Sequence, residues 1–184
     1  NAAAAATFVV YPDGNLTDEE AQKYINESGI KDIVDRAASK VYVARPANGI
    51  SFTDDDVIGF ETIVGKIGVS NNFKLIGIGD GATFINQNLT SYMNFVSGLA
   101  LINPAQGQEV KVSVPTYLVT DDQAVINSYV KANNAGKVKD GYYENPESHY
   151  EIVVVNSDTK TSAADATKDA WNTVLEKFGS IGHY

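Results

Sequence analysis

The sequence predicts a three-layer α/β fold with a mostly parallel sheet of about six strands. Short apolar runs alternate along the chain with amphipathic segments, and turn-forming glycine, proline and asparagine residues close several of the runs. Runs that are apolar throughout, rather than alternating with polar residues, are typical of parallel strands covered by helices on both faces. At 184 residues, the chain is long enough for one domain with a substantial core.

The expected elements follow one another in a regular order. The first strand, 7–11, ends at a Pro-Asp-Gly turn, and Thr17 with Glu20 forms a capping-box pattern at the start of the first helix. A second amphipathic segment runs from Ile30 to Ala37. Further strands are expected at 41–44, 74–77, 98–103, 115–119 and 151–155. Further helices are expected from Thr53 to Ile67, over 82–89, over 124–133, and in a closing segment with Trp171, Val174, Leu175 and Phe178 on one stripe.

Charge and composition exclude several classes of function. The net charge is −9, and the 14 lysine and arginine residues are scattered, so we expect neither a nucleic-acid partner nor an anionic membrane surface. No apolar span approaches the ~20 residues of a membrane helix, so we expect no membrane insertion. The absence of cysteine excludes disulfides, thiol catalysis and cysteine-based metal sites.

One glycine-rich stretch, Gly77-Ile78-Gly79-Asp80-Gly81, follows an apolar run and precedes a helical segment. This is the layout of a nucleophile elbow, G-x-S-x-G, in which a strand bends sharply into a helix and presents a serine at the apex. The apex position here is Gly79, which has no side chain. A glycine tolerates the positive φ of such a turn, and this fits a domain that kept the turn without its nucleophile.

Three segments of the chain carry a resemblance to a known family: KLIGIGDGATF, VSVPTYLVTDDQAVINSYVKANNA and EIVVVNSDTKTSAADATKDAWNTVLEKFGSIG. In order, they are similar to the elbow, the acid-bearing strand and loop, and the final strand, histidine loop and closing helix of α/β hydrolases. The chain resembles that fold from its third strand onward, and more narrowly the secreted esterases related to polyhydroxybutyrate depolymerases and feruloyl esterases. The resemblance implies a secreted bacterial protein, extracellular or at the cell surface. It also implies that residues 1–184 are one α/β-hydrolase-like domain of a longer multidomain chain.

The same resemblance shows which catalytic roles are filled. The acid would be Asp121 or Asp122, the nucleophile position is Gly79, and the histidine position near Asn156 has no imidazole. The two histidines, His149 and His183, lie before the last strand and near the end of the sequence. We therefore expect a non-catalytic domain without cofactors, with a structural, interaction or substrate-recruiting role beside a catalytic or structural domain of the same polypeptide.

Two alternatives remain open. The first is an active ester hydrolase whose nucleophile is Asp80, Ser157 or Ser180, although an Asp nucleophile still needs a histidine base, and Asp80 would more commonly cap the helix that follows it. The second is a metal or small-ligand site for Mg²⁺ or Ca²⁺ at the carboxyl edge of the sheet. Its ligands would come from Asp13, Asp80, Asp121 and Asp122, with Asp54, Asp55 and Asp56 nearby; acidic helix starts explain the same residues without a metal.

Two further places are candidates for binding a carbohydrate or an ester. Asp13 and Gly14 follow the first strand, at the edge where parallel sheets bind ligands. Tyr142 and Tyr143 lie in a stretch, 140–146, that we expect to be a loop, and paired tyrosines can stack on a sugar or contact a partner protein. The plain alternative is that these tyrosines anchor the loop.

Overall fold

The computed structural model describes residues 6–37, 39–67, 72–105, 110, 112–159 and 162–176, and these residues form an α/β fold around one sheet. The sheet order is β2-β1-β3-β4-β5-β8-β7-β6. The first six strands of this order are parallel, and β7 and β6 are antiparallel to their neighbours. The strands are β1 (Thr7–Tyr11), β2 (Lys40–Val43), β3 (Phe73–Ile78), β4 (Gly98–Ile102), β5 (Thr116–Val119), β6 (Gly136–Lys139), β7 (Tyr142–Glu144) and β8 (Glu151–Val155).

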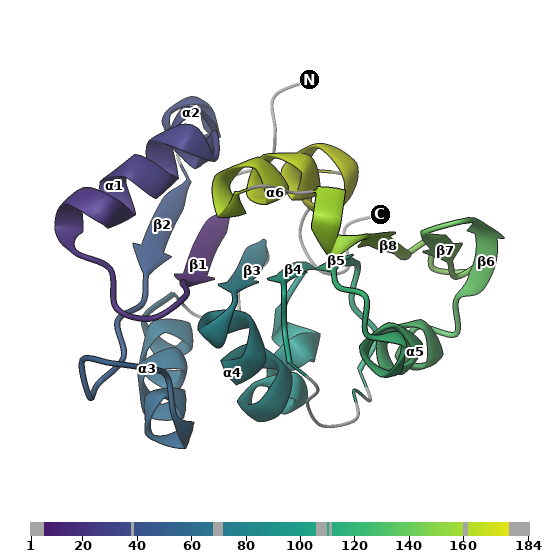
Figure 1. Ribbon diagram of the computed structural model, residues 1–184, viewed down its shortest axis with the longest axis horizontal. Coiled ribbons are helices and arrows are strands. Elements are labelled where there is room, and N and C mark those ends of the chain that lie inside the picture. Colours follow the sequence, from purple (N-terminus) through teal and green to yellow (C-terminus); the bar gives the residue numbers. More distant parts are fainter. Residues whose placement is uncertain are drawn as a thin grey trace.

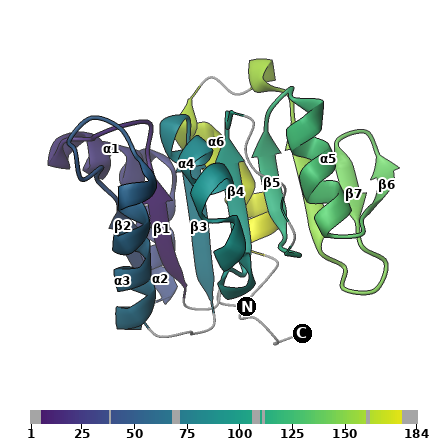
Figure 2. The same ribbon diagram turned by 90° about the horizontal axis from the view of Figure 1, so that it is seen from below.

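Helices cover both faces of the sheet and make three layers (Figure 1). One face carries α1 (Asp18–Glu27), α2 (Ile30–Ala37) and α6 (Ala163–Ala170), which continues as a π-helical turn (Trp171–Leu175). The other face carries α3 (Val57–Ile67), α4 (Asp80–Asn88) and α5 (Gln123–Ala132), which lie in front of the strands in Figure 2. Three short 3₁₀ segments are Asp54–Asp56, Thr90–Phe95 and Ser157–Thr159.

The core has two layers because successive side chains of a strand point to opposite faces. In β1, Phe8 and Val10 pack toward α1, α2 and α6, whereas Val9 packs toward α3, α4 and α5. Ile76 and Leu75 of β3 divide in the same way. All five side chains are at most 1% exposed, which explains why these strands are apolar at every position.

The structure confirms the α/β class and the mostly parallel sheet. Eight strands, not six, are described, because β6 and β7 extend the sheet beyond β8. The prediction of a loop over 140–146 was wrong for Tyr142–Glu144, which pair antiparallel with β8. Gly141, with a φ of 73°, makes the tight turn between β6 and β7. Phe178 of the expected closing helix lies outside the described residues.

Local sequence signals fix where the first helix begins. The Thr17 hydroxyl accepts a hydrogen bond from the Glu20 amide at 3.1 Å, and the Glu20 carboxylate accepts one from the Thr17 amide at 3.0 Å. The predicted capping box is therefore confirmed. In the part of the chain that the structure describes, no helix has the length and apolarity required to cross a membrane.

The topology marks one place on the sheet where ligands bind in other open α/β folds. The chain passes from β1 to β2 on one side and then returns to place β3 on the other side of β1. The loops that follow β1 and β3 therefore leave in opposite directions, and a crevice opens between them at the carboxyl ends of the strands. This is the topological switch point of the sheet.

Candidate functional site

The turn between β3 and α4 consists of a single residue, Gly79. Its φ of 53° and ψ of −114° bend the chain from the last strand residue, Ile78, into the first helical residue, Asp80. The Gly79 amide donates to the carbonyl of Ile102 at 2.8 Å, and its carbonyl accepts from the Thr83 amide at 3.0 Å. This backbone conformation is strained for any residue with a Cβ atom, so the turn has the sharp strand-to-helix geometry that the glycine pattern predicts.

The two flanking glycines permit the close approach of α4 to the sheet. A Cβ atom on Gly81 would lie 1.9 Å from the carbonyl oxygen of Tyr11, and one on Gly77 would lie 2.6 Å from the Cα of Ala82. The Gly81 amide uses this proximity to donate to the Pro12 carbonyl at 3.1 Å. Gly77 and Gly81 are therefore required by packing, whatever chemistry the turn carries.

The carboxylate of Asp13, in the loop after β1, lies inside this turn. Its Oδ1 accepts a hydrogen bond from the Asp80 amide at 2.9 Å. A Cβ atom on Gly79 would lie 2.4 Å from the same oxygen. The carboxylate thus occupies the space where an apex side chain would begin, and it binds the first amide of α4, where the helix dipole favours an anion.

The carboxylate of Asp80 points to a different loop. Its Oδ2 accepts a hydrogen bond from the Phe52 amide at 2.9 Å, in the segment before α3. The N-cap residue of α4 is Gly79, which has no side chain to cap the helix, and the Asp80 carboxylate binds the Phe52 amide instead, so the prediction that Asp80 caps its own helix was wrong. The reason is that Asp80 is the first helical residue rather than the residue before the helix, and Asp13 takes over the contact with its amide.

The predicted acid position contacts the predicted histidine loop. Asp121 accepts hydrogen bonds from both the amide and the hydroxyl of Ser157, which follows β8. Asn156 instead turns inward on its own loop and accepts from the Asp158 amide at 2.9 Å. Asp122 caps α5 through the Ala124 amide at 2.9 Å. Of the two candidate acids, Asp121 therefore reaches the loop after β8, and Ser157 is the residue that it meets.

The histidines lie elsewhere. His149 precedes β8, and its Nδ1 is 3.4 Å from the Glu144 carboxylate, at the end of the strand opposite to the Ser157 loop. His183 and Ser180 lie outside the described residues. Within the described ranges, no imidazole therefore stands near Asp80 or Asp121.

The acidic residues at the carboxyl edge have separate tasks. Asp56 accepts from the amides of Ala47 and Thr53, both at 2.8 Å, and caps the segment that starts at Asp54. Asp54 and Asp55 are exposed at that helix start. Among the described residues, no group of three or more acidic, histidine or cysteine side chains is placed to hold a metal ion.

The four residues expected to bind a ligand do not share one site. Asp13 and Gly14 follow β1, whereas Tyr142 and Tyr143 lie on β7, five strand spacings away, or about 24 Å. Tyr143 packs against the core on one face of β7. The pKa of Tyr142 is raised by burial and by its hydrogen bond to Glu151, and the Lys139 ammonium lies 5.6 Å from the centre of its ring. The tyrosines therefore anchor the β6–β7 hairpin.

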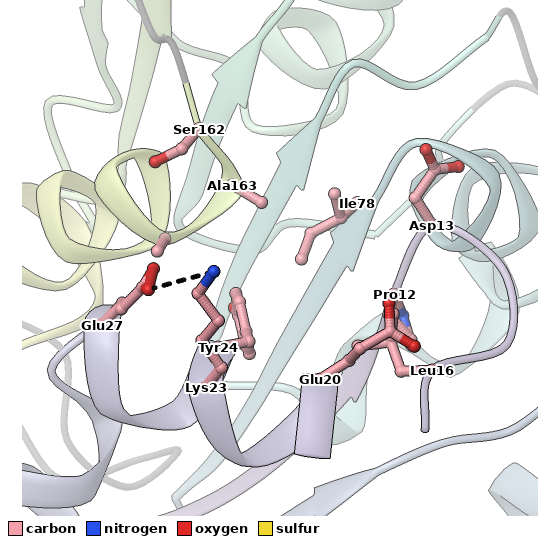
Figure 3. A pocket seen from close by; sticks show the side chains of 11 residues that line it. Pro12, Asp13, Leu16, Glu20, Lys23, Tyr24, Glu27, Ile78, Ser162 and Ala163 are labelled. Carbon is pink, nitrogen blue, oxygen red and sulfur yellow. Dashed lines mark ion pairs between the residues drawn. The ribbon is translucent and has the colours of Figure 1, made fainter. Parts of the chain in front are cut away.

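A cavity of about 350 Å³ opens at the switch point, between α1 and α6 (Figure 3). Its wall on α1 is formed by Glu20, Lys23, Tyr24 and Glu27, whose spacing puts them on one helix face. The N-terminal end of α6 forms the opposite wall, and Ile78 lies at the end of β3 between them. Of the site residues expected from the sequence, only Asp13 lines this cavity. The walls of the cavity come together through packing of segments far apart in the chain.

Comparison of the chain with protein-family models, with curated proteins and with solved structures gave no match. The turn at Gly79, the Asp121–Ser157 contact and the cavity are therefore the features of the chain that bear on its function.

Proposed function

We propose that this chain is a non-catalytic domain of the α/β-hydrolase type that lacks the first two strands of that fold. Its role is to support, contact or recruit substrate for a neighbouring domain of the same polypeptide, within a secreted esterase-like protein. The observation that carries this proposal is the carboxylate of Asp13 inside the turn at Gly79.

The likeness to hydrolases is supported by the order and contacts of three segments. In α/β hydrolases the nucleophile turn, the acid and the histidine follow one another along the chain. Here the one-residue turn at Gly79, the acid candidate Asp121 and the loop at Ser157 have the same order. The last two segments are in contact because β5 and β8 are neighbours in the sheet.

The absence of catalysis follows from the chemistry of the turn. In a serine hydrolase, the amide of the residue after the nucleophile stabilises the negative charge that develops on the substrate oxygen. The equivalent amide here, that of Asp80, donates instead to Asp13. A carboxylate at this point both blocks the oxygen's position and repels its charge, and Gly79 supplies no nucleophile.

Reconstruction of the missing groups tests this proposal. Gly79→Ser and Ser157→His together supply a nucleophile and a base, and a third change, Asp13→Gly, removes the carboxylate from the turn. We expect hydrolysis of p-nitrophenyl butyrate by the triple variant at a rate at least about tenfold above that of the wild type, since positioned acid–base groups contribute on the order of 10²-fold or more. The double variant that keeps Asp13 is the matched control. The Cβ atom added by Gly79→Ser displaces the Asp13 carboxylate but leaves its negative charge beside the turn, so we expect the double variant to be less active than the triple variant.

Two results would count against the proposal. Equal activity of the double and triple variants would show that Asp13 does not block the turn. Turnover by the wild type that is lost in Asp80→Ala would instead identify an enzyme with an aspartate nucleophile.

A further inference from the structure

The cavity between α1 and α6 lies where the fold favours ligands and has the size of a small-molecule site. It opens beside the carboxyl ends of β1 and β3, at the switch point, where open α/β sheets bind their ligands. Its volume of about 350 Å³ lies within the range of known ligand pockets, roughly 300–1,000 Å³. It is separate from the space inside the turn at Gly79, although Asp13 borders both.

The floor of the cavity is apolar and held in place. The Tyr24 ring is 9% exposed, and its hydroxyl makes a 2.7 Å hydrogen bond to the Thr167 hydroxyl on α6. This bond ties the two walls together and satisfies the polar atom of the ring. Ile78 and Ala164, each at most 9% exposed, complete the floor. A ligand that fills this space therefore needs an apolar body.

The rim of the cavity is acidic. Three carboxylates line it, those of Asp13, Glu20 and Glu27, against one ammonium, that of Lys23. The Lys23 ammonium lies 3.9 Å from Glu27, and Figure 3 shows this pair on one side of Tyr24, with Asp13 and Glu20 on the other. One oxygen of Asp13 accepts from the Asp80 amide, and one of Glu20 accepts from the Thr17 amide. These bonds hold the two carboxylates in place at the rim of the cavity.

The charge of the rim selects the class of ligand. Phosphates and carboxylates are disfavoured by the excess of negative charge, which matches the net charge of −9 of the whole chain. A bare metal ion needs several converging oxygens, and the described residues offer no such group. An apolar body with a positive head satisfies both the floor and the Asp13–Glu20 end of the rim.

We propose that the cavity between α1 and α6 binds a small organic ammonium ion, with its apolar part on Tyr24 and Ile78 and its cationic head at Asp13 and Glu20. The site shares Asp13 with the turn at Gly79 but uses none of Gly79, Asp121 and Ser157. Glu20→Gln and Ala163→Leu change the cavity and leave the turn intact, so failure of this site and failure of the proposed function are measured separately.

Titration calorimetry at low ionic strength tests the proposal, with n-butylammonium and choline as probes. Neutral n-butanol and the anion butyrate are the matched ligands of similar size. For ligands of five to seven heavy atoms we expect dissociation constants in the millimolar range, on the order of 1–10 mM. Binding should weaken as salt is added, because the rim is solvent-exposed.

Variants locate the head group of the ligand. Glu20→Gln removes one charge and keeps the capping box, since glutamine serves there as well. We expect it to weaken n-butylammonium binding about two- to fivefold, as for an exposed ion pair, and Asp13→Asn to do the same. Glu19→Gln makes the same change next to Glu20 but outside the cavity lining, and should leave binding unchanged. Ala163→Leu fills the cavity without a change of charge and should abolish binding.

Each outcome decides the proposal. Saturable binding of the ammonium ions that falls in Glu20→Gln and in Ala163→Leu, with circular dichroism showing folded variants, supports it. Equal binding of n-butanol, preferential binding of butyrate, or no saturable binding of either ammonium ion would overturn it. Unchanged affinity in both Glu20→Gln and Asp13→Asn would overturn it as well.

Discussion

The contact between Asp13 and the turn at Gly79 can be measured as a coupling between two mutations. Gly79→Ala adds a Cβ atom that would lie 2.4 Å from Asp13 Oδ1, so the carboxylate must rotate away and release the Asp80 amide. Asp13→Gly removes the same carboxylate directly. After either change, the hydrogen bond from Asp80 to Asp13 is gone, and the other change cannot remove it again.

The expected free energies follow from this geometry. The backbone of Gly79, at a φ of 53° and ψ of −114°, costs an alanine about 1–3 kcal/mol. The hydrogen bond at the helix start contributes about 1 kcal/mol, a value suited to an exposed capping contact. Gly79→Ala should therefore lower the free energy of unfolding by about 2–4 kcal/mol and Asp13→Gly by about 1 kcal/mol. The double variant should be about 1 kcal/mol more stable than the sum of the two single effects predicts.

Urea unfolding, followed by circular dichroism and extrapolated linearly, measures each of the four proteins. Gly49→Ala is the matched control, because Gly49 also has a positive φ, 77°, but a Cβ atom there would meet nothing within 4 Å. Its effect should be additive with that of Asp13→Gly. Additivity within about 0.3 kcal/mol for Gly79→Ala and Asp13→Gly would refute the claim that the carboxylate fills the turn.

Two further predictions concern packing and burial. Gly81→Ala should lower the free energy of unfolding by about 3 kcal/mol or more, because its Cβ atom would lie 1.9 Å from the Tyr11 carbonyl oxygen. In Gly59→Ala, on α3, the added Cβ atom would meet nothing within 4 Å, so the free energy of unfolding should rise by about 0.5–1 kcal/mol. Equal effects of the two changes in urea unfolding would contradict this difference in packing. Burial lowers the pKa of Lys74 from 10.5 to about 7. Between pH 7 and pH 10.5, the unfolded chain therefore binds a proton on this lysine that the folded protein lacks. The free energy of unfolding should rise with pH across this window, by up to about 1.4 kcal/mol per pH unit. The stability advantage of Lys74→Met over the wild type should therefore shrink from pH 7 to pH 9, and a constant difference in urea unfolding would show that burial leaves the lysine pKa unchanged.

Most of the fold could be predicted from the spacing of apolar residues along the chain. Strands such as β3, apolar at nearly every position, and helices such as α1, marked by Thr17 and Glu20, have local signals that the structure confirms. The strand β6, whose four residues are all exposed, has no apolar pattern to reveal it. The sequence predicts a loop for its partner β7, because the pairing of β7 with β8 is a long-range property that a window of sequence does not contain.

The candidate site was predictable only in part. The glycine pattern predicted the turn at Gly79. The sequence offered Asp121 and Asp122 as acids after the strand, and it is the structure that shows Asp121 meeting the loop after β8 and Asp122 capping α5. The sequence could not show that the carboxylate of Asp13, 67 residues from Asp80, accepts a hydrogen bond from the Asp80 amide in the turn. The cavity likewise depends on Tyr24 and Thr167, which are 143 residues apart. Both features result from how the helices pack on the sheet, and no local pattern encodes them.

The central claim is that the turn at Gly79 performs no hydrolysis because Asp13 occupies it. The most direct measurement is the rate of p-nitrophenyl butyrate hydrolysis by the wild-type protein from pH 5 to pH 9, beside the Asp80→Ala variant and buffer alone. We expect both proteins to release p-nitrophenol no faster than buffer at every pH. Multiple turnovers by the wild type, absent from Asp80→Ala, would contradict the account and place an aspartate nucleophile at this turn.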